Sequence, residues 1–135
     1  MVRLRDLVES GVLFVRSGFP QGRHNNQGRG VPHLRPFNVA SDGTIALSQL
    51  KYVSPPEPDS SYWLCAGDVI FNNTNSEDLV GKTAYFDASK PCVLSNHMTI
   101  IRVLDPATID SYWLAKRMHL AWSEGVFRRL CRRHV

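Results

Sequence analysis

The spacing of apolar residues changes near Asp105, and this change limits the folds open to the chain. Before Asp105 the apolar residues form short runs separated by glycine, proline and polar turn residues, which is typical of strands. After it they recur three and four residues apart, as on a helix, at Ile109, Trp113, Leu114, Met118, Ala121 and Trp122. The sequence therefore predicts an α+β domain: a strand-rich mixed-sheet body over 1–104 with projecting polar loops, followed by a C-terminal helical hairpin over 105–135.

Turn-forming residues mark the expected strands of the body. Asp42 and Gly43 suit a tight hairpin turn, because both residues tolerate a positive φ. The segment 19–30 contains three glycines and no aliphatic residue, so we expect a loop there. Strands are expected at 12–16, at 31–35, at 44–47, within 62–71, at 83–86 and within 92–104.

The C-terminal segment carries signals for two helices. Asp105 precedes Pro106, which predicts a helix start with an N-cap side chain ahead of a proline at the first helical position. Gly125 predicts the break between the helices. In the second helix we expect Phe127, Leu130 and Cys131 to face inward, with four arginines on or beside the other face.

Length and composition favour one cytoplasmic domain over 1–135. The chain has 135 residues and 43% hydrophobic residues, enough for a single core. It has no apolar stretch of about 20 residues and no signal peptide at its start, so we expect no membrane partner. The cysteines Cys65, Cys92 and Cys131 are odd in number and widely spaced, which argues against disulfides and zinc. We expect all three in or near the core.

Charge is distributed unevenly along the chain. The formal net charge is +4, made of +4 over 1–35, −5 over 36–115 and +5 over 116–135. Arginine outnumbers lysine by 12 to 4. Because the guanidinium group forms paired hydrogen bonds with phosphate and with guanine, the two basic ends suggest a nucleic-acid partner. The alternative is a solvated arginine-rich surface that binds nothing.

Known catalytic and cofactor motifs are missing. The triplet GKT at 81–83 resembles the end of a phosphate-binding loop, but Ser76 stands where that loop needs its first glycine. The sequence has no GxGxxG, HExxH or GxSxG motif, and its five histidines are scattered. We therefore expect no cofactor, no metal site and no catalytic residue.

Two polar loops carry the side chains best suited to reading bases. Asparagine and glutamine can pair with adenine through two hydrogen bonds, and arginine can do the same with guanine. The alternative is that many of these asparagines bond to their own backbone in Asx-turns. The first loop supplies Gln21, Arg23, His24, Asn25, Asn26, Gln27 and Arg29, and the second supplies Asn72, Asn73, Thr74, Asn75 and Ser76.

An ordered set of motifs resembles one known family. The motifs are VPHLRPFNV (31–39), LCAGDVIFNNTNS (64–76), LVGKTAYF (79–86), LSNHMTIIRV (94–103) and DPATIDSYWLAKRM (105–118). Each is weak alone, but the set covers nearly the whole chain in the family's order. The chain resembles a target recognition domain from the specificity subunit of type I restriction–modification enzymes.

This resemblance implies sequence-specific binding of double-stranded DNA without catalysis, as a module that directs separate methyltransferase and restriction subunits. The two polar loops, with Asn96 and His97, would face base edges. Gly67, Asp68 and Gly81 would shape turns, and Lys82 would contact a phosphate or neutralise Asp68. The remaining expected DNA contacts are basic: Arg16, Arg35, Arg128, Arg129, Arg132 and Arg133.

The chain departs from the family at its C-terminal end. Specificity subunits carry two recognition domains joined by long spacer helices, whereas this sequence has one recognition pattern and stops at 132–135 without a spacer helix. We expect either a piece of a longer subunit or a natural half-unit. A second recognition domain or a second copy of the chain would then complete the site.

Two other functions stay open at this stage. A small metal-dependent nuclease could gather Asp59, Asp68, Glu77, Asp78 or Asp87 around Mg²⁺. A protein-interaction fragment could use Tyr62, Trp63, Tyr112, Trp113 and Trp122 as anchors. The DNA-binding hypothesis requires that the basic ends and the amide-bearing loops share one concave face.

Overall fold

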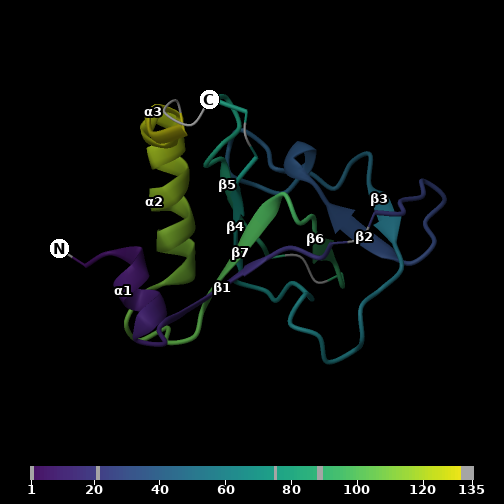
Figure 1. Cartoon of the computed structure of the whole chain (residues 1–135), viewed down its shortest axis with the longest axis horizontal. Coiled ribbons are helices and arrows are strands. Elements are labelled where there is room, and N and C mark those ends of the chain that lie inside the picture. The colour runs from purple at the N-terminus through teal and green to yellow at the C-terminus, as the bar shows by residue number, and fades with distance from the viewer. Residues whose placement is uncertain (1, 21, 75, 88–89, 132–135) are drawn as a thin grey trace.

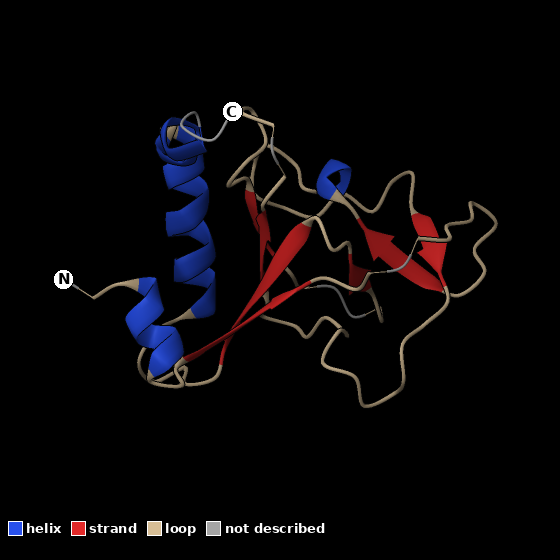
Figure 2. Cartoon of the chain, viewed as in Figure 1, coloured by secondary structure: helices blue, strands red, loops and turns tan. Residues whose placement is uncertain are grey.

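The structure is a computed structural model that describes residues 2–20, 22–74, 76–87 and 90–131 (Figure 1). Two sheets lie side by side along its long axis, and helices cover one end (Figure 2). The helices are α1 Leu4–Glu9, α2 Ser111–Ser123 and α3 Val126–Cys131, with a 3-10 turn, η1, at Pro36–Asn38. None of the described helices is long and apolar enough to cross a membrane.

The larger sheet has the order β1-β7-β4-β5, and all its neighbours are antiparallel. Alternation of side chains gives it two apolar faces, because successive residues of a strand point to opposite sides. Val69 and Ile101 pack with Leu114 of α2, whereas Ile70 and Ile100 face a second cluster. The strands are β1 Leu13–Ser17, β7 Met98–Val103, β4 Val69–Asn72 and β5 Thr83–Tyr85.

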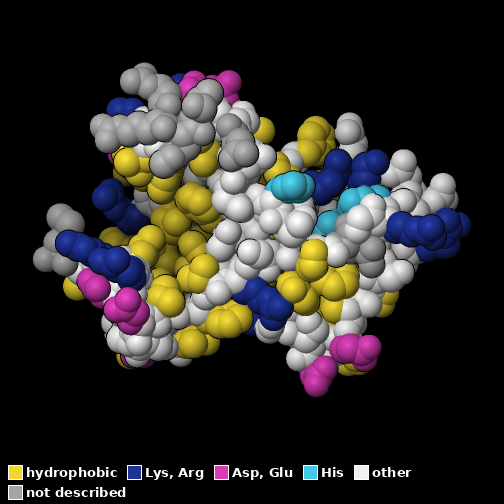
Figure 3. Space-filling view, in the orientation of Figure 1, with side chains coloured by type: hydrophobic (Ala, Val, Ile, Leu, Met, Phe, Trp, Pro, Cys, Tyr) yellow, Lys and Arg dark blue, Asp and Glu magenta, His cyan; other side chains and the backbone are white. Residues whose placement is uncertain are grey.

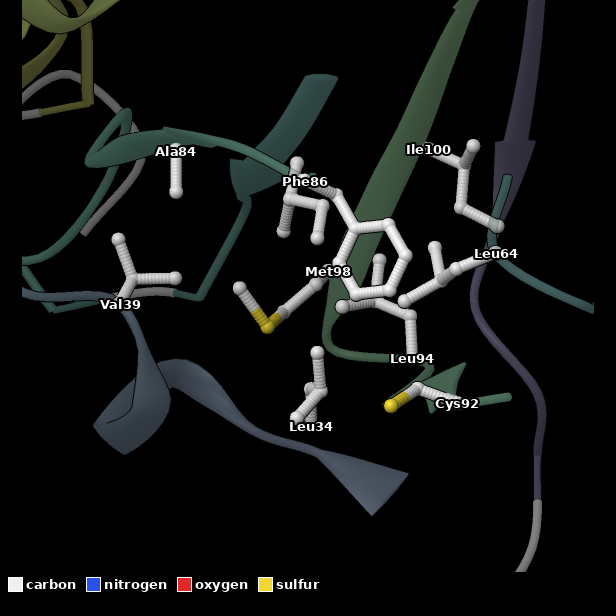
Figure 4. Packing of buried hydrophobic residues seen from close by; sticks show 10 residues of the cluster. Leu34, Val39, Leu64, Ala84, Phe86, Cys92, Leu94, Met98 and Ile100 are labelled. Carbon is white, nitrogen blue, oxygen red and sulfur yellow. The ribbon is translucent and has the colours of Figure 1, made fainter. Parts of the chain in front are cut away.

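The smaller sheet has the order β3-β2-β6. Its central strand β2 (Val31–Leu34) runs antiparallel to β3 (Lys51–Val53) and parallel to β6 (Val93–Leu94), so this sheet is mixed, as predicted. The cluster between the sheets includes Leu34, Phe86 and Met98 (Figure 4). This shared core fixes the smaller sheet against the larger one.

The strand predicted at 44–47 is wrong. Asp42 and Gly43 do form a turn, in which Asp42 accepts from the backbone and hydroxyl of Thr44, but only Val39 and Ile45 form a bridge across it. The buried Asn38 explains the difference. Its amide nitrogen donates to the carbonyls of Ala46 and Ser48, which a partner strand would otherwise use. The strand forms later in the chain, as β3.

The first helix of the C-terminal pair starts later than predicted. Asp105 caps only a single turn, accepting from the backbone of Ala107 and the hydroxyl of Thr108. The N-cap of α2 is Asp110, whose carboxylate accepts from the backbone of Trp113 at 2.8 Å. Gly125 does separate the helices and has φ +78°.

Two burial predictions are also wrong. Leu130 of α3 is 64% exposed. Cys65 is exposed, since it lies in the turn before β4. Phe127 does face inward, and its ring lies edge-on to that of Phe71 at 5.1 Å.

Gly18 joins the two sheets at a point where no side chain fits. A Cβ atom at this position would lie 2.0 Å from the carbonyl oxygen of Ser95. We expect Gly18→Ala to lower the free energy of unfolding by about 2–3 kcal/mol, because the two backbones must separate. Urea unfolding measures the change. The matched substitution Gly22→Ala meets no atom within 4 Å and should cost less than about 0.5 kcal/mol. Equal losses in the two variants would contradict the close approach.

Candidate nucleic-acid interface

A pocket of about 440 Å³ opens where the loop 22–29, the end of β2 and the turn 95–97 meet. Its walls include the predicted site residues His24, Arg35, Asn96 and His97. On the face in Figure 3, histidine side chains gather beside lysine and arginine side chains on the half of the molecule that carries the smaller sheet. The fold therefore brings together residues that are more than 70 positions apart in the sequence.

Two histidines form the inner wall of this pocket. The Nε2 atom of His24 lies 2.8 Å from Nδ1 of His33, and the rings stack. His33 is 2% exposed, and its Nε2 atom lies 3.2 Å from the carbonyl oxygen of Phe19. Burial lowers the pKa of His33, so this ring is neutral near neutral pH.

The loop 22–29 is held by Asn25. Its side-chain oxygen accepts from the backbones of Gln27 and Arg29, and its main chain pairs with Tyr52 of β3. Asn25 thus supports the loop rather than pointing a free amide outward. Asn26, Gln27, Arg23 and Arg29 are exposed, and Gln21 lies outside the described residues.

The second polar loop divides into buried and exposed members. Asn72 is fully buried, and its side-chain oxygen accepts from the backbone of Thr74, so its amide does not reach a base in this structure. Asn73 is exposed, and its backbone donates to the carbonyl of His97 at 3.3 Å. Ser76 is exposed, and Asn75 lies outside the described residues. Asn73, Asn96 and His97 therefore stand next to each other.

The predicted phosphate contacts are spread over the molecule. Arg16 lies over the ring of Tyr62 at 3.7 Å, and Lys82 lies 5.5 Å from the ring of Trp122. Arg128 shares a hollow with the acidic Glu77 and Asp78. Arg129 is exposed and bonds to the carbonyl of Glu124, and Arg132 and Arg133 lie outside the described residues.

The two basic ends do not meet in one concavity, contrary to the expectation from sequence. The helices α2 and α3, which carry Lys116, Arg117, Arg128 and Arg129, lie at one end of the longest axis, and the smaller sheet with the loop 22–29 lies at the other (Figure 1). Arg35 lies on the pocket wall, and Lys51 lines a neighbouring hollow that shares Arg35 and Phe37 with the pocket.

Asp68 is bound by an arginine rather than by Lys82. Nε and one terminal nitrogen of Arg102 donate to the two carboxylate oxygens at 2.8 and 2.9 Å. The hydrogen bond from Asp68 raises the pKa of Arg102. In the part of the chain that the structure describes, no group of three or more His, Cys, Asp or Glu side chains is placed to hold a metal ion. Asp68 therefore has a structural partner and does not join the carboxylates of the nuclease hypothesis.

Comparison with known proteins finds relatives of this chain and of its fold. No protein-family model matches the chain. A curated relative from Methanocaldococcus jannaschii, which bears the name type I restriction enzyme MjaX specificity subunit, is 25% identical over 134 residues. That alignment covers 98% of this chain and 30% of the relative. The chain is a relative of type I specificity subunits.

Two solved structures share the fold. One chain comes from a study of complex assembly and conformational transition in a type I restriction–modification system, with a TM-score of 0.61 and 18% identity. The other is the HsdS subunit from Thermoanaerobacter tengcongensis, with a TM-score of 0.57 and 20% identity. Each match covers 85% of this chain and 27% of the solved chain. The predicted resemblance and the α+β fold class are confirmed, and the chain spans less than a third of these relatives.

Sequence reasoning missed three residues of this specificity-subunit fold that line the pocket or the hollow beside it. Phe37 of η1 is 55% exposed and forms a rim shared with a second hollow lined by Gln49 and Lys51. The signal was present for Phe37, because it lies within the motif VPHLRPFNV. Gln49 and Lys51 follow the strand predicted at 44–47, in a segment for which no strand was predicted, so their position could not be anticipated.

His33 should make stability depend on pH. Its pKa is lowered in the folded state, so the unfolded chain binds more protons below about pH 6.5. Stability is therefore complete above that value and falls as the pH decreases, by up to about 1.4 kcal/mol per pH unit. Urea unfolding at several pH values measures this slope, and His33→Gln should flatten it. An unchanged slope in that variant would assign the pH dependence to other groups.

Proposed function

We propose that this chain is a target recognition domain of a type I specificity subunit and binds double-stranded DNA in a sequence-specific manner. The observation that carries the proposal is the match along 98% of the chain to a relative that bears a specificity subunit's name. The pocket region supports it, because exposed amides stand there beside cations. Amides and arginines read base edges, while lysines and arginines bind phosphates.

The proposed contact surface is smaller than the set expected from sequence. We include Arg23, His24, Asn26, Gln27, Arg29, Arg35, Asn73, Asn96 and His97, and we add Phe37, Gln49 and Lys51. Asn25 and Asn72 are left out because their side chains hold the backbone of the loops. Ser76, Lys82, Arg128 and Arg129 lie toward the helical end and would contribute only to a longer duplex.

Methylation and cleavage are assigned to other subunits in this proposal. The chain would act without a catalytic residue or cofactor, in the cytoplasm, and would direct methyltransferase and restriction subunits to a target. It spans 30% of its curated relative, so contacts with those subunits need not lie within it. A single-domain organisation over 1–135, completed by a second recognition domain or a second copy, belongs to the same proposal.

A binding and selection experiment tests the proposal. Labelled duplexes of about 30 random base pairs are titrated with the protein at several salt concentrations. We expect the logarithm of the binding constant to fall linearly with the logarithm of salt concentration, because phosphate contacts release counterions. Repeated selection of bound duplexes should then enrich one sequence motif. Binding that ignores salt and enriches no motif would reject DNA recognition.

Two exposed aromatic residues favour a second function, in which the start of α2 binds another protein molecule. Tyr112 and Trp113 at the start of α2 are 52% and 54% exposed. Aromatic side chains of this size are frequent anchors in protein interfaces. Light scattering across a concentration series distinguishes a monomer from a self-associating domain, and self-association that Trp113→Ser abolishes would place the contact there.

A further inference from the structure

The pocket contains a hydrogen-bond chain whose proton positions can be deduced. The carbonyl of Phe19 can only accept, so Nε2 of His33 must donate to it. His33 is buried and neutral, which leaves Nδ1 of this ring as an acceptor. Nε2 of His24 must then carry a proton and donate to His33 over 2.8 Å.

These hydrogen bonds determine which nitrogen of His24 can take up a proton. Its one remaining nitrogen is Nδ1, to which no described residue hydrogen-bonds. His24 is exposed and lines the pocket, so a proton from solvent can add at Nδ1. Nε2 keeps its hydrogen bond to His33 when that happens. Protonation therefore adds one positive charge and one donor to the pocket and breaks no contact.

The pocket holds positive charge without a matching carboxylate. Arg35 lies on its wall and donates to the carbonyl of Gln49, while its Nε atom is buried without a hydrogen-bond partner. No described Asp or Glu side chain lines the pocket or forms an ion pair with Arg35. A buried donor without a partner costs free energy, and an uncompensated cation attracts an anion.

We propose that this pocket binds one backbone phosphate of DNA, with His24 donating from a protonated Nδ1 and with Arg35 and His97 completing the anion site. The identification of the anion as a DNA phosphate rests on the proposed function, whereas anion binding itself does not. The assignment moves His24 and His97 from base reading to phosphate contact. His97 reaches the pocket from the turn 95–97, which Ser95 supports by accepting from the backbone of His97.

Binding by this mechanism takes up a proton. Phosphate binding favours the form of His24 that carries a proton on Nδ1, so affinity should rise as the pH falls. The charged and titratable groups on the surrounding elements are Arg23 and Arg29 of the loop, His33 of β2, Arg35 at the start of η1, Lys51 and Tyr52 of β3, and His97 of the turn. None of these side chains bears a negative charge at neutral pH. They favour binding of an anion.

The anion site is tested without DNA, with inorganic sulfate as the probe because its charge is constant across the pH range. Imidazole ¹⁵N signals are followed from about pH 8 to about pH 5.5 in sodium sulfate and in sodium chloride of equal ionic strength. We expect sulfate to raise the titration midpoint of His24 by about one pH unit. His119 is the internal control, because its two nitrogens contact the backbones of Thr83 and Ser41 and it does not line the pocket. An unchanged midpoint for His24, or equal shifts in both histidines, would overturn the proposal.

The second experiment measures DNA binding by the unaltered protein and by a matched pair of variants. For a random-sequence duplex at constant salt, the unaltered protein should bind about tenfold more tightly at about pH 6 than at about pH 8. His24→Gln keeps a donor for His33 but cannot become charged, so the two affinities should differ by less than about twofold. His97→Gln should retain the His24-dependent increase. Thermal unfolding first establishes that both variants fold.

The outcomes separate this inference from the proposed function. DNA binding without a pH response, or with a response that only His97→Gln removes, overturns the His24 site and leaves DNA recognition standing. A sulfate-dependent shift of His24 in a protein that binds no DNA keeps the anion site and rejects the DNA phosphate.

Discussion

The Arg102→Met variant is expected to lose about 3–5 kcal/mol of unfolding free energy. The carboxylate of Asp68 is 1% exposed, and Arg102 supplies two of its three hydrogen bonds, the third coming from the backbone of Cys65. Without Arg102 a buried negative charge remains with one donor. Arg102 also ties the turn before β4 to β7 by donating to the carbonyl of Trp63. Urea unfolding followed by circular dichroism measures the loss.

Two further variants show whether the loss comes from the unpaired charge. The double substitution Asp68→Leu with Arg102→Met leaves no charge buried, so it should lose less than about half as much as Arg102→Met alone. Arg16→Met removes an arginine that forms no ion pair with any described carboxylate and lies over Tyr62, which should cost about 1 kcal/mol. A loss below about 1 kcal/mol in Arg102→Met would mean that the Arg102–Asp68 ion pair stabilises the fold no more than an exposed ion pair does.

The triple variant Arg29→Gln, Arg35→Gln and Lys51→Gln should bind random-sequence DNA roughly 100-fold more weakly at about 0.1 M salt. Arg35 lines the pocket and the neighbouring hollow, Lys51 of β3 lines that second hollow, and Arg29 is exposed on the loop 22–29. Each phosphate contact that is removed should also lower the salt slope by about 0.9. Fluorescence anisotropy across a salt series gives both quantities.

A charge-matched control tests whether position, rather than net charge, matters. Arg5, Lys116 and Arg117 lie on α1 and α2 at the other end of the molecule, and all three are exposed. Replacing them with glutamine removes the same charge and should weaken binding less than about fivefold. Equal losses in the two triple variants would indicate a diffuse attraction and would argue against an interface at the smaller sheet.

Local patterns predicted the parts of the fold that depend on neighbouring residues. The strands β1, β2, β4, β5 and β7 lie where apolar runs end at turn-forming residues. The break at Gly125 was found because its signal is a single residue. The errors arose where a distant or competing group takes part. Asn38 reaches Ala46 and Ser48 and prevents a strand, and Asp110 caps α2 in place of Asp105.

The candidate site could be predicted only by residue type. Amides in a loop look alike in sequence, yet Asn72 is fully buried, whereas Asn73 is exposed. Pairing of His24 with His33 depends on the position of Phe19 beside Ser95, which brings together segments from opposite parts of the chain. The sequence also does not show which charged groups pair with each other, since Arg102 rather than Lys82 forms the ion pair with Asp68. Hydrophobic spacing carries no information on such contacts.

The antiparallel pairing of β1 with β7 has a consequence for synthesis of the chain. Leu13 pairs with Val103, and Ser17 pairs with Thr99. The first strand to be translated therefore cannot pair until the last strand has been synthesised. While β7 is still within the ribosome, β1 has no neighbour on either edge, and the larger sheet cannot close. Folding of this domain should therefore be slow relative to helical domains of its size and should finish only after most of it has emerged.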